Sequence, residues 1–180
     1  MAKPGIDRGL TQVYTGDGKG KTTAALGAAL RALGWGLKVC VVQFIKGYAD
    51  TGEMKIAERF PSQYVIRQFA TDSSGYIDEE QARGRRQECE AAMAYAEEVV
   101  AGGEFDVVIL DEINNAMAYK LIDVERALRL IREKPAHVEL ILTGRRAPVE
   151  IVQAADLVTE MLMIKHPHEQ GIAARRGIDY

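Results

Sequence analysis

The segment Thr15-Gly-Asp-Gly-Lys-Gly-Lys-Thr-Thr23 decides the fold, because it joins a β-rich run to a helical pattern. Its glycines allow consecutive backbone N–H groups to point at phosphate oxygens, and the following helix N-terminus adds positive potential. Lys21 supplies a point charge, and the Thr22 hydroxyl is placed to bind Mg²⁺. This arrangement is typical of a P-loop. The residues that it predicts to bind a nucleotide triphosphate are Gly16, Asp17, Gly18, Lys19, Gly20, Lys21, Thr22 and Thr23.

The loop is a variant of the usual pattern G-x-x-x-x-G-K-[ST]. Thr15 stands where the pattern has its first glycine, and the first glycine here is Gly16. Asp17 adds a carboxylate near the expected phosphates, which is mildly unfavourable unless a lysine or arginine pairs with it. A plain glycine-rich turn between strand and helix is the simpler alternative, so a second motif is needed.

The run Asp106-Val-Val-Ile-Leu-Asp-Glu112 provides that second motif. It is an apolar strand that ends in two carboxylates, as the Walker-B strand of P-loop proteins does. In a parallel sheet its carboxyl end lies at the same edge as the phosphate loop, so Asp111 or Glu112 is expected to reach a metal directly or through water. A solvated strand end is the alternative for this motif alone, and the two motifs together favour binding of a magnesium nucleotide.

β-rich runs and helical patterns alternate along the rest of the chain, which predicts parallel strands joined by crossover helices. We expect an α/β protein with the P-loop NTPase (RecA-like) fold, in which helices flank a mostly parallel central sheet of about six strands. No repeat or linker interrupts residues 1–180, so we expect one domain. The expected strands are 10–14, 38–45, 64–69, 105–110, 137–142 and 157–164, and the expected helices are 21–33, 53–59, 78–101, 123–133 and 148–155.

The composition is that of an ordinary globular protein, with 47% hydrophobic and 27% charged residues. A net charge of -3 argues against a general nucleic-acid binder. Cys40 and Cys89 do not make a disulfide framework, and no cysteine and histidine spacing indicates zinc. No apolar run is as long as a membrane span, and the N-terminus lacks the apolar core of a signal peptide. We therefore expect a cytoplasmic protein.

Six segments together carry a more specific resemblance. They are GDGKGKTTAALGAALRALGWG, VVQFIKG, DVVILDEINNAMAYKLID, LTGRRAP, AADLVTEM and IKHPHEQGIAARRGIDY. In this combination the chain resembles the P-loop corrinoid adenosyltransferases from about residue 9 to residue 180. The resemblance is weakest between residues 48 and 101.

The resemblance implies transfer of the 5′-deoxyadenosyl group of ATP to the Co(I) centre of a reduced corrinoid, with release of inorganic triphosphate. The corrinoid is cob(I)alamin or cob(I)yrinic acid a,c-diamide. By matched position, Thr22 and Glu112 hold Mg²⁺ while Lys21 and Lys19 counter the charge of the leaving group, so Lys21 and Glu112 are the expected catalytic residues. The variant loop beginning at Thr15 would then hold all three phosphates as one departing unit.

The resemblance also implies a corrinoid site. Members are understood to bind Co(II) corrinoid without its lower axial ligand, using apolar and aromatic side chains after the third strand. Phe69 and Tyr76 are the candidates here, with simple core packing as the alternative. Arg145 is expected to meet phosphate or corrin groups, unless its loop is merely solvated, and His166 to shape the ribose or base end of the site. A reduced flavoprotein donor and a homodimer are implied as well.

Two other functions share the motifs. A small-molecule P-loop kinase would have the same fold and ATP site, but it usually needs an arginine-rich lid, and the chain has no obvious one. An ATP-dependent switch of the ParA type would also carry a G-K-T-T loop, but such proteins are longer and usually carry a basic or amphipathic surface. Asn114 and Asn115 follow the acidic pair, and the sequence leaves open whether they contact corrin or another subunit.

Overall fold

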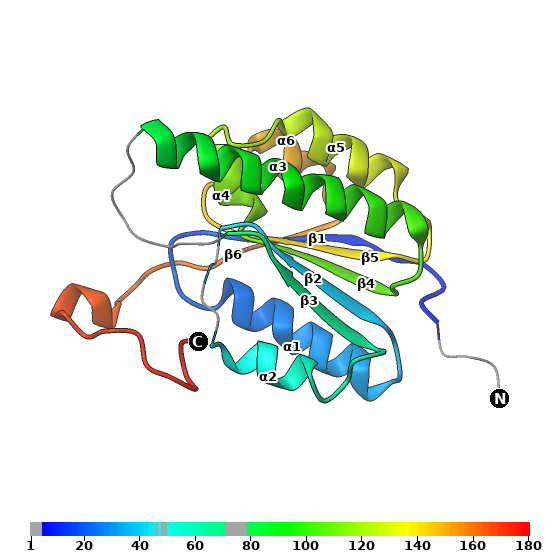
Figure 1. Ribbon diagram of the computed structural model, residues 1–180, viewed down its shortest axis with the longest axis horizontal. Helices are drawn as coiled ribbons and strands as arrows, with labels where there is room; N and C mark the ends of the chain where they lie inside the picture. Colours follow the sequence, from blue (N-terminus) through cyan, green and yellow to red (C-terminus); the bar gives the residue numbers. More distant parts are fainter. Residues whose placement is uncertain (1–4, 46, 48–49, 71–78) are drawn as a thin grey trace.

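One six-stranded parallel sheet forms the centre of the molecule (Figure 1). The computed structural model describes residues 5–45, 47, 50–70 and 79–180. The strand order is β3-β2-β4-β5-β1-β6, and every neighbouring pair runs parallel, as predicted. The strands are β1 (Thr11–Thr15), β2 (Val39–Gln43), β3 (Tyr64–Gln68), β4 (Val107–Asp111), β5 (Glu139–Thr143) and β6 (Leu157–Glu160).

Helices cover both faces of the sheet (Figure 1). On one face lie α1 (Lys21–Gly34) and α2 (Gly52–Ala57). On the other face lie α3 (Glu79–Gly102), α4 (Ile113–Ala118), α5 (Val124–Glu133) and α6 (Val149–Ala154). A short 3₁₀ helix, η1 (Pro167–Gln170), lies in the C-terminal segment. The fold is therefore the three-layer arrangement that alternating strands and helices predict.

The pleat of the strands explains why the core has two halves. Successive side chains of a strand point to opposite faces. On β2, Cys40 and Val42 pack in the cluster that includes α3, whereas Val39 and Val41 pack in the cluster that includes α1. All five residues of β2 and of β4 are buried, which is why these strands appear in the sequence as continuous apolar runs.

The element bounds differ from the predicted ones mainly at two places. The sixth strand ends at Glu160 rather than at 164, because the chain then crosses the phosphate loop and the Met161 carbonyl accepts the Gly18 N–H at 2.7 Å. Helix α4 was not predicted. Its six residues follow the acidic pair directly and are too few to show a helical period.

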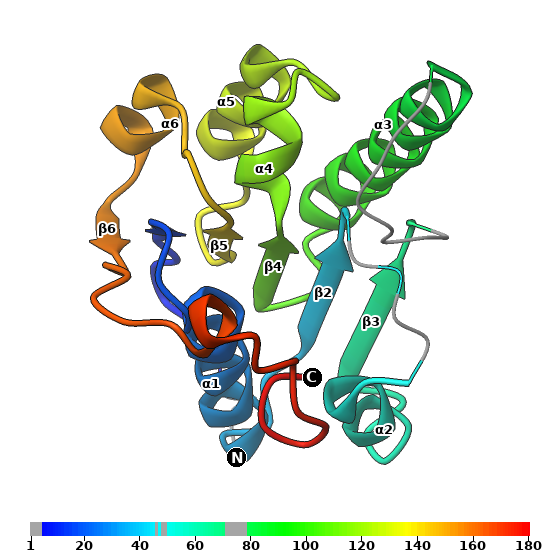
Figure 2. The same cartoon turned by 90° about the vertical axis from the view of Figure 1, so that its left-hand side faces the viewer.

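The strand order determines which residues meet at the carboxyl edge of the sheet. Because β5 lies between β1 and β4, Thr143 at the end of β5 lies between the phosphate loop and Asp111. The segment from residue 161 to 180, which we call the tail, crosses the end of the molecule at which α1 begins (Figure 2). Within the described ranges, no helix combines the length and the apolar character needed to cross a membrane.

Candidate active site

A pocket opens where the phosphate loop, the end of β4 and the tail meet. The phosphate loop forms one wall, the start of α2 another and the tail a third. Its lining residues are Asp17, Gly18, Lys19, Gly20, Lys21, Thr22, Thr23, Leu26, Thr51, Gly52, Glu53, Glu112, Arg145, His166, Gly177, Ile178, Asp179 and Tyr180. The phosphate loop and Glu112 of the acidic strand end therefore face the same space.

Lys21 lies inside the curl of the phosphate loop and is only 8% exposed. Its ammonium donates hydrogen bonds to the carbonyl oxygens of Gly16 and Gly18, both at 2.7 Å. Burial lowers the pKa of Lys21, and the positive charge of Arg145 lowers it further, while nearby carboxylates oppose the change. The loop therefore holds this cation by its own backbone, at the place where phosphate oxygens are expected.

Asp111 anchors the base of the pocket and is completely buried. One of its oxygens, Oδ1, accepts the Thr22 hydroxyl at 2.8 Å and the Thr143 hydroxyl at 2.6 Å. Its other oxygen, Oδ2, lies 3.4 Å from the side-chain nitrogen of Gln43. We call the buried residues Lys21, Gln43, Asp111 and Thr143 the floor of the site. A carboxylate buried with several donors is the arrangement that keeps a charge stable inside a protein.

Glu112 differs from its neighbour because it points into the pocket. It adopts the left-handed conformation, with φ 66° and ψ 16°, immediately before α4. That conformation is unfavourable for a residue with a Cβ and persists only where the surroundings enforce it. Here the Glu112 N–H donates to the Thr143 hydroxyl oxygen at 3.0 Å. The Thr143 hydroxyl therefore binds both members of the acidic pair, the carboxylate of Asp111 and the backbone N–H of Glu112.

The donors at the base of the pocket suit a hard cation. The Thr22 hydroxyl and the carboxylates of Asp111 and Glu112 are oxygen ligands, the kind that Mg²⁺ prefers. Over the part of the chain that the structure describes, His, Cys, Asp and Glu form no group of three or more that would hold a metal ion by itself. Mg²⁺ at nucleotide sites usually uses one or two carboxylates together with phosphates and water, so the residues present fit such an ion.

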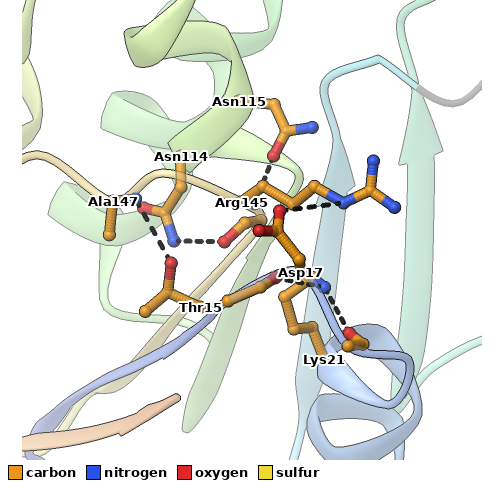
Figure 3. Close-up of polar contacts among 10 residues, drawn as sticks. Thr15, Asp17, Lys21, Asn114, Asn115, Arg145 and Ala147 are labelled. Atoms are coloured by element: carbon orange, nitrogen blue, oxygen red, sulfur yellow. Dashed lines mark hydrogen bonds and ion pairs between the residues drawn. The ribbon is translucent and has the colours of Figure 1, made fainter. Parts of the chain in front are cut away.

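Two ion pairs cross the mouth of the pocket. Arg145 places its Nε 3.9 Å from Asp17 Oδ1, which supplies the partner that the Asp17 carboxylate was expected to need (Figure 3). Lys19 lies 3.3 Å from Asp179 Oδ1 of the tail. The Arg175 backbone N–H, the Arg175 side chain and Lys19 together lower the pKa of Asp179 to about 2. The loop cations therefore already contact carboxylates.

Of the four corrinoid candidates, two line the pocket and one lies elsewhere in the structure. Arg145 and His166 line the pocket. Phe69 is half-buried instead and packs against Tyr95 of α3, with ring centroids 5.6 Å apart and the planes tilted by 44°. Tyr76 lies outside the described residues. His166 accepts the His168 N–H on its Nδ1 at 3.2 Å.

Several contributors to the site were not predicted from the sequence, among them Thr143, Gln43, the start of α2 and the end of the tail. Thr143 and Gln43 each end an apolar strand with a polar residue, which was the available signal. The end of the tail carried part of the family resemblance, but nothing in its sequence indicated that Asp179 would contact Lys19.

The fold and the two motifs define a P-loop nucleotide-binding protein of the RecA-like type. Among solved structures, the flagellar accessory protein FlaH from Methanocaldococcus jannaschii is similar, with a TM-score of 0.56. The match covers 89% of this chain and 77% of that one, at 15% identity, so it supports the fold alone.

The sequence comparisons give the family. The model of the family described as ATP:corrinoid adenosyltransferase BtuR/CobO/CobP matches residues 7–180. A corrinoid adenosyltransferase from Pseudomonas aeruginosa is 39% identical over all of this chain and 88% of its own length. One from Escherichia coli strain K12 is 36% identical over all of this chain and 90% of its own length. The chain belongs to the ATP:corrinoid adenosyltransferase family, as its motifs predicted, and it is a transferase.

Proposed function

We propose that the pocket holds ATP by its triphosphate while the 5′-deoxyadenosyl group passes to the cobalt of a reduced corrinoid. The observation that carries this proposal is that Lys21, Thr22 and Glu112 line one pocket, with the buried Asp111 bound to the Thr22 hydroxyl, in a chain from this family. The substrates proposed are ATP and either cob(I)alamin or cob(I)yrinic acid a,c-diamide.

In this reaction the electron pair of Co(I) attacks C5′ of ATP. The bond between C5′ and the α-phosphate oxygen breaks, its electron pair leaves with the triphosphate, and cobalt becomes formally Co(III). Because Co(I) is itself a strong nucleophile, the protein needs no nucleophilic side chain. Its tasks are to align the reacting atoms and to stabilise charge on the leaving triphosphate.

Stabilisation of the leaving group is assigned to the cations of the loop. Lys21 is proposed to leave the Gly16 and Gly18 carbonyls and bind phosphate oxygens instead. Lys19 pairs with the partly exposed Asp179 and Arg145 with the exposed Asp17, so exchanging these partners for triphosphate costs little. Phosphate and corrin contacts were both expected for Arg145, and it is assigned here to the triphosphate because it lines the pocket and lies 3.9 Å from Asp17 of the phosphate loop.

Mg²⁺ is proposed to bind at Thr22 and Glu112, with Asp111 acting directly or through water. When bound, the ion would neutralise charge on the phosphate oxygens. The protein's own part is to orient these ligands. Asp111 holds the Thr22 hydroxyl at 2.8 Å, and Thr143 fixes the backbone of Glu112.

The corrinoid side of the site is proposed to lie toward His166, Phe69 and Tyr76. His166, which belongs to the tail, lines the pocket, and this suits a role at the ribose or base end of ATP. Phe69 is proposed to meet the corrinoid by exchanging its contact with Tyr95 for one with the substrate.

The oligomeric state, the cellular location and the electron donor are part of the same proposal. The whole chain from 1 to 180 is proposed to act as one domain, as a homodimer and in the cytoplasm. A reduced flavoprotein is proposed as the electron donor.

The test is anaerobic incubation of the protein with ATP, Mg²⁺ and chemically reduced cobalamin. We expect the Co(I) spectrum to disappear, a Co–C product to form and tripolyphosphate to accumulate in equal amount. Formation of ADP would instead identify a kinase. ATP-dependent dimerisation with slow release of ADP and no effect of corrinoid would identify a switch.

Within that experiment, the Glu112→Ala variant tests whether the Glu112 carboxylate takes part in the reaction. Glu112 is proposed to hold Mg²⁺ beside the leaving triphosphate, where negative charge develops. We expect its loss to lower turnover by about 10²-fold or more. Glu150→Ala is the control, because Glu150 is an exposed carboxylate in the first turn of α6. An unchanged rate for Glu112→Ala would overturn its assignment.

A further inference from the structure

The loop from Gly144 to Ala147 is tied to two neighbouring elements (Figure 3). On one side, the Ala147 N–H donates to the Thr15 hydroxyl oxygen at 3.2 Å, which attaches the loop to the phosphate loop. On the other side, the Arg145 N–H donates to the side-chain oxygen of Asn115 in α4 at 2.5 Å. The donor must be the backbone N–H, so the orientation of the Asn115 amide follows from the bond itself.

The backbone of this loop has a conformation that needs external support. Arg146 has φ 55° and Gly144 has φ 127°, both in the region that residues with a Cβ avoid. A Cβ on Gly144 would lie 2.6 Å from Asn115 Oδ1. Asn115 therefore lies directly against the turn, where its hydrogen bond fixes the direction in which Arg145 leaves the backbone.

The ion pair that Arg145 makes with Asp17 is too weak to fix that direction. Arg145 Nε lies 3.9 Å from Asp17 Oδ1, and the two side chains are 55% and 72% exposed. Exposed pairs of this kind contribute little, because water and salt screen them. The hydrogen bond from the Arg145 N–H to Asn115 is shorter than this ion pair. Asn115 belongs to α4, which packs into the core through Ile113, Ala116 and Met117.

We propose that Asn115 is a positioning residue for the adenosyl transfer, which holds the Arg145 backbone so that the guanidinium faces the triphosphate. The proposal rests on the assignment of Arg145 to the triphosphate made above. Asn115 itself touches neither substrate. It acts through Arg145, and its contribution disappears when the guanidinium is removed.

A double-mutant cycle tests this, with the dissociation constant of tripolyphosphate measured by calorimetry in the presence of Mg²⁺. Arg145→Ala removes a charged donor, and we expect affinity to fall about 10- to 100-fold. Asn115→Ala keeps the guanidinium but frees its backbone, and we expect a fall of about three- to tenfold. In the Arg145→Ala background, Asn115→Ala should change affinity by less than about 1.5-fold, because the guanidinium through which Asn115 acts is already absent.

Gln153→Ala is the matched control, because it removes an amide from an exposed position of α6 and should leave the affinity unchanged. Asn115→Leu, which fills the same space without an acceptor, repeats the test if the alanine variant loses stability. An equal effect of Asn115→Ala in both backgrounds, or no effect in the native one, overturns the positioning role while leaving the assignment of Arg145 intact. An unchanged affinity for Arg145→Ala overturns both.

Discussion

The floor of the site and the tail that covers it are built in opposite ways. In the floor, Asp111 binds Thr143 at 2.6 Å and Gln43 at 3.4 Å at the buried ends of three central strands, and the loop backbone holds Lys21 beside them. The tail is exposed at most positions and meets the rest of the molecule through ion pairs such as Lys19 with Asp179 and Arg176 with Asp50. Buried networks are costly to disturb, and exposed pairs are not. We therefore expect the floor to keep its arrangement when substrate binds, and the ion pairs of the tail to be the contacts that change.

The largest effect is expected when the cation of the floor is removed. Lys21→Ala should lower kcat/KM by about 10²- to 10³-fold, because one preorganised partner of the departing charge is lost. Initial rates of Co–C bond formation measure this. Lys38→Ala, which removes a lysine paired with the exposed Glu104 far from the loop, is the control. Equal rates for the two variants would contradict the assignment of Lys21.

A smaller effect is expected from a floor residue that does not touch the triphosphate. Thr143→Val leaves Asp111 with one donor fewer and the Glu112 N–H without this acceptor. We expect unfolding to become easier by about 1–3 kcal/mol, as for other buried groups left unsatisfied. Denaturant titration measures it, with Thr159→Val on the exposed strand β6 as the control. Turnover should fall as well, since Glu112 loses part of its support. A stability equal to that of the native protein would show that the floor is not a network.

In the tail, Asp179→Asn should change binding only slightly and in the favourable direction. The substitution removes a carboxylate from an anion site but keeps an oxygen that accepts the Arg175 N–H. We expect tripolyphosphate to bind about two- to fivefold more tightly at low salt, and the gain to shrink as salt screens the charges. Titrations at two ionic strengths measure it. Weaker binding of tripolyphosphate by the variant would show that the charge of Asp179 keeps the tail in the position that binding requires.

The pH dependence of that contact has a definite sign. The pKa of Asp179 is lowered to about 2, so the carboxylate stays ionised at every neutral or mildly acidic pH. Its contribution is present above the ordinary carboxyl range and is lost only as the pH falls through about 2. The difference in free energy of unfolding between the native protein and the Asp179→Asn variant should therefore be constant from pH 5 to pH 8.

The smallest effect is expected at the two cysteines of the core. Burial raises the pKa of Cys40 to about 11 and that of Cys89 to about 12, and both side chains are almost completely buried. A thiol reagent at pH 8 should therefore label neither in the folded protein and both after denaturation. Labelling that is rapid and complete without denaturant would show that the core opens as easily as the tail.

The sequence by itself determined the elements that one local pattern encodes. The phosphate loop, the acidic strand end and the parallel α/β fold each follow from residue types at short spacing, and the family followed from several such motifs together. The helix expected over 123–133 is present as α5, and Asp123 caps it by accepting the Glu125 N–H.

Only the tertiary structure decided which strand ends meet. Thr143 belongs to the floor because β5 lies between β1 and β4, and Gln43 belongs to it because β2 lies on the other side of β4. Strand order depends on how crossovers pack over the whole sheet, so neighbouring residues in the chain do not reveal it. The same reason separates Asp111 from Glu112. They are adjacent in the sequence, yet a left-handed turn sends one into the floor and the other into the pocket.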